Sequence, residues 1–534
     1  MNDDSPKAEA VAVLGDSIVF VGSNQEVKKW IGDSTQLIDL DGKTMTPGFI
    51  EGHAHFMGIG FNQMNLDLLS ATSFEEVLQK VEEAVKNTRP GVWINGRGWH
   101  QDKWDSLPDT MVRGFPVHEA LSAISPDNPV YLKHASGHAA LANAKAMEIA
   151  GIANFAKEGP IVKEVEGGEV IKDELGNPTG IFNENAMGLV TSHIPGKTLG
   201  SNLRAAELAM QECLKNGITS FQDAGITRDI EQMYRKLAEE NRLKVRLWAM
   251  ISGSDTSLLQ QYYQSGPAIG LGHNFLTIRS IKLYTDGALG SRGAWLLEEY
   301  SDMPGEHGHQ TTPMSYVYQT SLKALESGLQ VCSHAIGDRA NREVLDNYEK
   351  AFQEKPELAK DHRFRIEHAQ HLSAQDIPRF GQLGVIPAMQ AVHMSSDRPW
   401  AIERLGKDRI EEGAYVWRKL LDSGARIVNG TDAPVEPVNP LASFYASVSR
   451  RTLAGDPENG FEPSQKMSRE EALKSYTLDA AYAAFEENIK GSIEVGKLAD
   501  FTVFSQNIML IPEEEILNTN VEMTFVGGKL EYKR

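Results

Sequence analysis

Short apolar runs of strand length alternate with helical patterns along the chain from about residue 206 onward. This rhythm is typical of βα units arranged around a parallel sheet. The predicted strands are Thr46–Glu51, Thr219–Gln222, Val245–Met250, Ile278–Leu283, Gln330–Ser333, Phe364–Glu367, Val385–Met389 and Arg426–Asn429. A closed barrel of this class requires eight strands, so we predict an α/β fold built as a (β/α)8 TIM barrel.

Both ends of the chain have a different pattern, that of short antiparallel strands. Ala10–Val13 and Ser17–Gly22 flank a Leu-Gly-Asp turn, and Met523–Leu530 resembles a final hairpin. We expect residues 1–46 and 488–534 to form a small composite β-sandwich domain, although two unrelated hairpins are an alternative. The barrel would span residues 47–487. Residues 58–205 are too many for a single connection, and they predict a large insertion after the first barrel strand.

Several of the predicted strands end in a side chain that can bind a metal ion. The first strand runs into His53 and His55, and this H-x-H spacing turns both imidazoles to the same side of a strand. The remaining candidates, on strands four, five, six and eight, are Lys282, His334, His368 and Asp432. The C-terminal ends of barrel strands meet at one mouth, where active sites are found. All six residues are therefore predicted to converge on one metal site.

Each of these residues also has an ordinary structural explanation when it is considered alone. An H-x-H pair is often a surface or packing feature, and Lys282 within an apolar run would normally extend its amine to solvent. His334 can simply end a strand, and Asp432 can cap a helix. The shared position of all of them at strand ends favours the metal site over these separate explanations.

Composition narrows the range of partners. The formal net charge of −20 argues against a nucleic-acid partner and against binding to an anionic membrane surface. No apolar run is long enough to span a membrane, and the first residues lack the pattern of a secretory signal. Cys213 and Cys332 are the only cysteines, which excludes a disulfide framework and a four-cysteine zinc site. We expect a cytoplasmic protein that acts on a small-molecule substrate, with homo-oligomer formation left open.

Several segments resemble the amidohydrolase superfamily, and in particular its YtcJ-like branch, also called the amidohydrolase-3 family. The superfamily motifs are TPGFIEGHAHF (46–56), HAIGDRA (334–340), RIEHAQ (365–370), NGTDAPVEPVNPL (429–441) and GSIEVGKLADFTVF (491–504). The branch is indicated by IKLYTDGALGSRGA (281–294) and SGHAALANAKAM (136–147). Related chains usually begin with one more strand, so we expect the terminal sheet of this chain to expose an unpaired edge.

The resemblance implies a barrel that holds two divalent ions, usually zinc. One ion would be bound by His53, His55 and Asp432, and the other by His334 and His368. Lys282 would bridge the two ions as a carbamate formed with carbon dioxide. An unmodified ammonium has no lone pair to offer, whereas burial and nearby positive charge favour the neutral amine that can be carboxylated. The alternative is a single metal ion beside an unmodified lysine.

The predicted reaction is hydrolysis of a non-peptide C–N bond in an amide, a cyclic amide or an N-formyl compound. A metal-bound hydroxide would attack the carbonyl carbon, with Asp432 as general base and then general acid. Deamination is an alternative, but deaminases of this superfamily usually lack a lysine ligand on strand four. A catalytically idle regulatory or binding homologue is a second alternative, although all six ligand positions are filled.

Residues that contact the substrate are harder to predict. Trp99 and Trp104 belong to an aromatic cluster in the insertion, where they would either form a wall of the substrate pocket or the insertion's own core. Arg292 follows the strand that carries Lys282, and we consider it a candidate for binding an anionic group. His138 lies in a family-like motif and is a further candidate for the pocket.

Overall fold

The computed structural model describes residues 6–101, 104–134, 139–152, 165 and 168–534, and it divides the chain into two compact units. Unit 1 comprises Met1–Ile59 and Ala206–Arg534, and unit 2 comprises Gly60–Ala205. None of the described helices combines the length and the apolar character that crossing a membrane requires.

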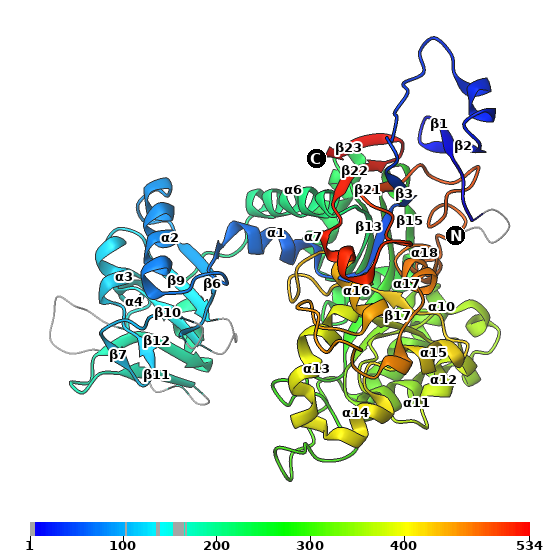
Figure 1. Ribbon diagram of the computed structural model, residues 1–534. Coiled ribbons are helices and arrows are strands. Elements are labelled where there is room, and N and C mark those ends of the chain that lie inside the picture. The colour runs from blue at the N-terminus through cyan, green and yellow to red at the C-terminus, as the bar shows by residue number, and fades with distance from the viewer. Residues whose placement is uncertain (1–5, 102–103, 135–138, 153–164, 166–167) are drawn as a thin grey trace. The chain divides into compact units, whose positions relative to one another are not determined.

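Unit 1 contains a sheet of parallel strands that closes almost completely into a barrel (Figure 1). Its strands, in order around the barrel, are β4 (Phe49–Ala54), β13 (Ile218–Ile226), β14 (Arg246–Ser252), β16 (Leu276–Tyr284), β17 (Gln330–Ala335), β18 (Arg365–His368), β19 (Ile386–Met389) and β20 (Val428–Asn429). The strands β4 and β20 approach each other so closely that a Cβ atom on Gly52 would lie 2.4 Å from the carbonyl oxygen of Asn429. The predicted TIM-barrel fold is confirmed.

Helices alternate with the barrel strands along the chain. They are α6 (Leu199–Lys215), α7 (Arg228–Glu239), α8 (Thr256–Ser265), α10 (Met314–Ser327), α11 (Asp338–Glu354), α12 (Ile377–Leu383), α13 (Ala391–Leu405), α14 (Lys407–Gly413), α15 (Trp417–Asp422), α16 (Pro440–Ser449), α17 (Arg469–Ser475) and α18 (Leu478–Ala483). Two barrel glutamines hold α18 by donating to its backbone carbonyls, Gln222 to Ala480 over 2.7 Å and Gln330 to Ala483 over 2.9 Å. Apolar residues of α18 also share a buried cluster with β4, β19 and β20.

The first predicted strand, Thr46–Glu51, needs a correction. Its start belongs to β3 (Thr44–Pro47), which pairs with a C-terminal strand, whereas the barrel strand β4 begins only at Phe49. The chain passes from one sheet to the other at Gly48, where a Cβ atom would lie 2.2 Å from the Thr219 side chain. The Pro47-Gly48 pair is a typical turn signal, and it marks this boundary in the sequence.

Strands from both ends of the chain lie side by side in unit 1. The four-stranded antiparallel sheet contains β3, β21 (Phe501–Phe504), β22 (Val521–Val526) and β23 (Lys529–Lys533), and β1 (Ala10–Leu14) pairs with β2 (Ser17–Gly22). Ile18 of β2 shares a buried apolar cluster with Phe501 and Phe525. The predicted hairpins at the two ends are therefore present and pack together.

Unit 2 is built on a six-stranded mixed sheet, and a short hairpin formed by β7 (Met111–Val112) and β8 (Phe115–Pro116) lies outside it. In spatial order the sheet contains β11 (Gly168–Lys172), β12 (Pro178–Glu184), β10 (Ala139–Ala142), β9 (Val130–His134), β6 (Ile94–Trp99) and β5 (Leu66–Asp67). Its helices are α2 (Phe74–Asn87), α3 (Glu119–Ile124), α4 (Ala144–Ile149) and α5 (Gly188–Thr191). The helix α1 (Phe56–Met64) leads from the barrel into this unit.

Candidate metal centre

Two histidines and an aspartate meet where β4 and β20 end. His53 lies in β4, His55 follows it directly, and Asp432 follows β20. The Oδ1 atom of Asp432 lies 3.2 Å from Nε2 of His55 and 3.6 Å from Nε2 of His53. His53 is fully buried, whereas the His55 side chain is 33% exposed. These three residues can offer their donor atoms to one cation.

Backbone contacts between the two strand ends explain why Asp432 reaches His53. The Asp432 amide donates to the His53 carbonyl over 2.8 Å, and the Thr431 amide donates to the buried Glu51 carboxylate over 2.7 Å. Gly430 makes this approach possible, because a Cβ atom there would lie 2.6 Å from the His53 nitrogen. The amide of His55 is fixed as well, since it donates to Ala433.

A second group of donor atoms lies beside the first. His368 ends β18, and its ring centroid lies 5.0 Å from that of His53 and 4.5 Å from that of His334 at the end of β17. His368 and Asp432 also form a possible cation site with His393, a residue of α13 that the sequence did not suggest. Asp432 is thus shared by two sets that each contain two imidazoles and one carboxylate.

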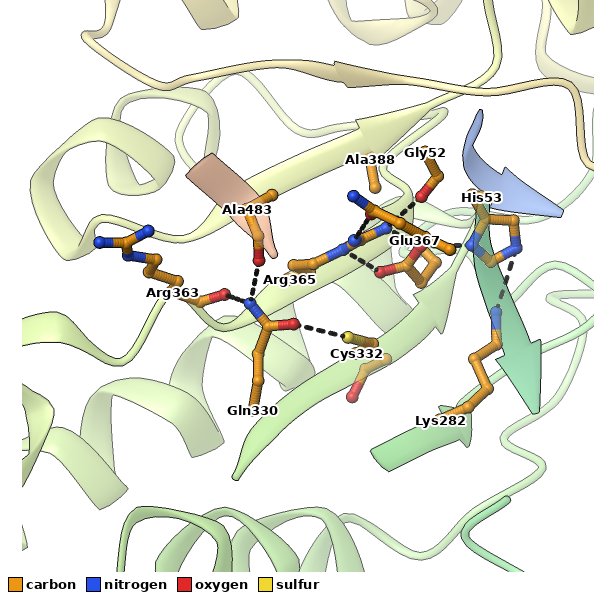
Figure 2. A network of polar contacts seen from close by, with 12 residues as sticks. Gly52, His53, Lys282, Gln330, Cys332, Arg363, Arg365, Glu367, Ala388 and Ala483 are labelled. Carbon is orange, nitrogen blue, oxygen red and sulfur yellow. Dashed lines mark hydrogen bonds and ion pairs between the residues drawn. The ribbon is translucent and has the colours of Figure 1, made fainter. Parts of the chain in front are cut away.

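Lys282 of β16 completes the predicted group. Its Nζ atom lies 3.3 Å from Nε2 of His53, and its side chain is buried (Figure 2). Burial lowers the pKa of Lys282, although the carboxylates of Glu367 and Asp432 oppose this shift. The structure therefore brings all six predicted ligands to one end of the barrel.

The Nδ1 atoms of three of these histidines face an acceptor outside the centre. His53 is paired with Glu367, His334 with Asp286 over 3.0 Å, and His368 with Oε1 of Gln390 over 2.6 Å. A carboxylate can only accept, so Nδ1 must carry the proton in the first two pairs. Gln390 donates through Nε2 to the Ala388 carbonyl, which leaves its oxygen to accept from His368. This arrangement leaves each Nε2 atom free to bind a cation.

Glu367 is held inside the barrel by a buried arginine (Figure 2). Arg365 donates to both of its carboxylate oxygens over 2.8 Å, to the Gly52 carbonyl over 2.7 Å and to Gln222. Burial opposes ionisation of Glu367, but the positive charge of Arg365 and the hydrogen bond with His53 keep its pKa well below the usual range. A negative charge is therefore fixed behind His53.

The electrostatic environment keeps the candidate ligands in the protonation states that bind metal. Burial lowers the pKa of His53 to about 4 and lowers that of His368 well below its ordinary value. Burial works against ionisation of Asp432, but a hydrogen bond from His55 holds its pKa well below the usual range. At neutral pH His53 and His368 are thus neutral and Asp432 is ionised, and these forms suit a divalent cation such as zinc.

The predicted substrate contacts lie in different surroundings. Arg292 forms an ion pair with Asp302 over 2.7 Å, so an anionic substrate group would have to compete with that carboxylate. Trp99 and Trp104 lie in the core of unit 2, where Trp99 also donates to the Leu132 carbonyl over 2.8 Å. His138 lies outside the described residues. A role of these four residues in substrate binding stays a prediction.

Sequence reasoning missed Glu367, Asp286, Gln390 and His393. Glu367 directly precedes His368, and strict alternation along a strand would place only one of the two near the centre. His368 has a φ of 77°, in the left-handed region, and this conformation breaks the alternation. His393 gave a weak signal, because it follows the seventh strand by only a few residues.

Residues 36–532 match the sequence profile of the amidohydrolase family called Amidohydro_3. This chain belongs to the amidohydrolase family. Protein LONG AFTER FAR-RED 3 of Arabidopsis thaliana is 33% identical to this amidohydrolase over 99% of this chain and 89% of that protein. The N-substituted formamide deformylase of Arthrobacter pascens is 28% identical over 99% of this chain and 95% of the relative.

A solved structure resembles this amidohydrolase over nearly its whole length. It is an uncharacterized metal-dependent hydrolase from Pyrococcus furiosus, with 27% identity and a TM-score of 0.75, and the match covers 93% of this chain and 95% of that one. The expected family, the barrel fold and the assignment as a hydrolase enzyme are confirmed by these matches and by the observed strand order.

Proposed function

We propose that this amidohydrolase is a metal-dependent enzyme that hydrolyses the C–N bond of a small amide, cyclic amide or N-formyl compound. The observation that carries the proposal is the convergence of His53, His55, His368 and Asp432 with Lys282 at one end of the barrel. Most of these donor atoms are buried, and their pKa shifts favour the metal-binding forms.

The site would hold two divalent cations, with zinc as the expected metal. His53, His55 and Asp432 would bind one cation, and His334 and His368 would bind the other. When bound, such cations supply Lewis-acid activation of a water molecule and of the scissile carbonyl. The chain's own contribution is to hold His53, His334 and His368 by their Nδ1 atoms, so that the Nε2 atoms of these three residues are oriented before the cations arrive.

Lys282 would act in its carboxylated form. The neutral amine adds to carbon dioxide and releases one proton, which gives a carbamate that carries two oxygen donors. Burial favours the neutral amine, since it lowers the pKa of Lys282. A negatively charged carbamate would also remove the repulsion that an ammonium 3.3 Å from a ligand nitrogen would exert on a cation.

Asp432 would transfer the proton of the reaction. Its carboxylate is buried and ionised, and Oδ1 lies 3.2 Å from Nε2 of His55 at the metal centre, so it would be able to accept a proton from the attacking water. The same carboxyl group then returns the proton to the leaving nitrogen as the C–N bond breaks. An N-formyl substrate and water would yield formate and an amine.

The substrate class is supported by the Arthrobacter pascens relative, which is an N-substituted formamide deformylase. The test is to express the full chain with zinc, measure its metal content and assay a panel of N-formyl, N-acyl and cyclic amides for amine release. We expect close to two cations per chain and turnover of at least one N-formyl compound. Metal-loaded protein that releases no amine from the panel would contradict the proposed reaction.

Lys282→Ala tests the bridge separately. We expect this variant to lose a cation and activity together, and a short carboxylic acid in the buffer to restore part of both. A density map of fully metal-loaded protein with an unmodified Lys282 amine would contradict the carbamate.

A further inference from the structure

His393 is a buried histidine that the reaction described above does not use. It lies in the first turn of α13 and is 8% exposed. Its Nε2 atom is buried and has no hydrogen-bond partner among the described residues. Leaving a buried polar atom without a partner costs on the order of 1–3 kcal/mol, so such an atom in a functional site points to a missing ligand.

The surroundings of His393 identify the kind of ligand. Its donor atom, one from His368 and one from Asp432 all lie within 4.8 Å of one another. Two atoms that bind the same zinc ion at about 2.0–2.2 Å are at most about 4.4 Å apart, so a small side-chain movement is sufficient. Two imidazoles and one carboxylate with an open position are the donor set of many catalytic zinc sites. We infer that His393 is a further protein ligand of the second cation, in addition to His334 and His368.

The position of α13 supports this assignment. Gln390 lies at the N-cap of the helix and accepts a hydrogen bond from His368, so one short segment orients His368 and supplies His393. The rings of the two histidines are nearly parallel, with centroids 6.0 Å apart. Two arginines anchor the helix further along: Arg398 donates to Glu462 over 2.6 Å, and Arg404 pairs with Asp302. These contacts hold the helix that carries His393 beside His368.

Asp397 adds negative charge on the same side of α13. It lies one helical turn after His393 and interacts with it electrostatically. No lysine, arginine or histidine nitrogen lies within 4.0 Å of its carboxylate in the described part of the chain, and the carboxylate accepts hydrogen bonds from Gln370 over 3.3 Å and from Ser396 over 3.4 Å. A carboxylate without a counter-ion beside His393 strengthens the attraction for a cation.

The test compares His393→Ala with His371→Ala. His371 is an equally demanding control, because it is 3% exposed, both of its ring nitrogens lack a partner, and it belongs to neither donor set. Each full-length variant is stripped with a chelator, reloaded with Zn²⁺ and assayed for bound zinc by elemental analysis and for affinity by chelator competition. Co²⁺-loaded samples report the coordination number through their visible absorption spectra.

We expect His393→Ala to retain one zinc ion fewer per chain, or to bind the weaker ion more than about 100-fold less tightly, which exceeds the about 10–100-fold typical of losing an outer partner. His371→Ala should bind zinc like the wild type. The zinc affinity of Asp397→Asn should lie between those of His393→Ala and His371→Ala. If His393→Ala does not fold, His393→Gln carries the same expectation, with a changed Co²⁺ spectrum.

The inference rests on the metal dependence proposed above, but it can fail independently. Folded His393 variants with wild-type zinc content, affinity and Co²⁺ spectrum would overturn it, even if they had lost turnover, because His393 would then contact the substrate instead. A failure of the substrate panel would contradict the proposed reaction and leave the zinc measurements valid.

Discussion

Single residues behind the ligands orient the ligands and set their protonation. Glu367 is the clearest example. Its fully buried carboxylate contacts the Nδ1 atom of His53 and also forms an ion pair with Arg365. An outer carboxylate of this kind fixes the tautomer of the imidazole and makes its other nitrogen a better donor. Its removal should therefore be detected first in metal affinity.

Glu367→Gln keeps the shape of the side chain and removes its charge. We expect zinc affinity to fall by about 10–100-fold, since His53 loses its anionic partner. The variant should also be less stable, because Arg365 remains buried without its counter-ion. Chelator competition and urea unfolding measure the two effects. Glu231→Gln is the control, since Glu231 is also buried and pairs with Arg235, and it should lose stability without losing zinc affinity. Equal zinc affinity of the Glu367 variant and the wild type would contradict the positioning role.

Asp432→Asn tests the proposed proton transfer. We expect kcat/KM for any substrate from the panel to fall by about 10²–10⁴-fold or more, because Asp432 is also a proposed ligand. Circular dichroism should show a normally folded protein. Asp376→Asn is a suitable comparison, because Asp376 is a buried carboxylate held by Arg342 and Arg379 outside the donor sets. Near-normal turnover by the Asp432 variant would show that another group moves the proton.

At the scale of elements, the strand ends and the helix starts decide where the ligands lie. Two ligands have a left-handed φ. His368, the last residue of β18, has a φ of 77°, and Asp432, which follows β20, has a φ of 57°. These conformations change the direction of the backbone where the strands end. Side chains of neighbouring residues there do not point to alternate faces of the sheet as they do within a strand. Helix starts are stabilised by N-caps and ion pairs, and the contribution of such contacts to stability can be measured at α17.

The capping box of α17 should make stability depend on pH. Ser468 and Glu471 cap the helix reciprocally, and Arg418 donates to Glu471 over 2.9 Å. The hydrogen bond from Arg418 lowers the pKa of Glu471 from 4.5 to about 2, although burial opposes it. A depressed carboxyl pKa stabilises the folded state above the unfolded value, and this contribution is lost as the pH falls from about 5 toward 2.

Glu471→Gln should therefore destabilise the protein by about 1–2 kcal/mol at pH 7, a value that allows for solvent screening of this partly exposed pair. Urea unfolding at pH 7, 5 and 4 should show the difference from the wild type shrinking as the pH falls. The neighbouring Glu470→Gln provides the comparison, because Glu470 is more exposed and pairs along the helix with Lys474. A difference that stays constant across this range would argue against the linkage.

At the scale of the whole molecule, unit 1 joins the barrel to a sheet formed by both chain ends. Arg246 at the start of β14 donates to Asp500, just before β21, over 2.8 and 3.0 Å. Asp500 also accepts from the Gly527 amide over 2.8 Å, and the side chains of both charged residues are almost fully buried. One buried ion pair thus connects the barrel with the terminal sheet.

Asp500→Ala should cost about 3–5 kcal/mol, because it leaves Arg246 buried without a counter-ion. The midpoint of urea unfolding, followed by tryptophan fluorescence, is the appropriate measurement. Arg246→Met combined with Asp500→Leu should recover part of the loss, since no unpaired charge remains. An unchanged midpoint for Asp500→Ala would mean that the pair does not contribute to stability.

Removal of divalent cations should loosen unit 1 in particular. Both donor sets lie in unit 1, and the described residues of unit 2 contain no comparable group. Zinc at about 100 times its dissociation constant would add about 2.7 kcal/mol to the stability of the folded state. Hydrogen exchange before and after chelation should show lost protection around β4, β18 and β20, with Gly60–Ala205 unchanged. A uniform loss across both units would contradict a centre confined to the barrel.

Local sequence pattern was sufficient to predict the barrel and its six candidate ligands. Strand hydrophobicity is a short-range property, and a residue at the end of a βα strand must lie at the barrel mouth wherever its neighbours are. The same logic predicted the hairpins at the two ends of the chain. It failed at Thr46–Glu51, where the Pro47-Gly48 pair separates two segments that join different sheets.

Only the tertiary structure decided which residues support the ligands. Glu367 contacts a histidine 314 positions away, and no local pattern encodes a pairing across the barrel interior. His393 joins His368 and Asp432 because α13 is anchored beside the barrel mouth, which depends on contacts from distant loops. Trp99 and Trp104 lie in a core that forms only when unit 2 folds. The sequence by itself determined the elements and the ligand chemistry, whereas long-range packing determined the distances, the protonation states and the partners of each ligand.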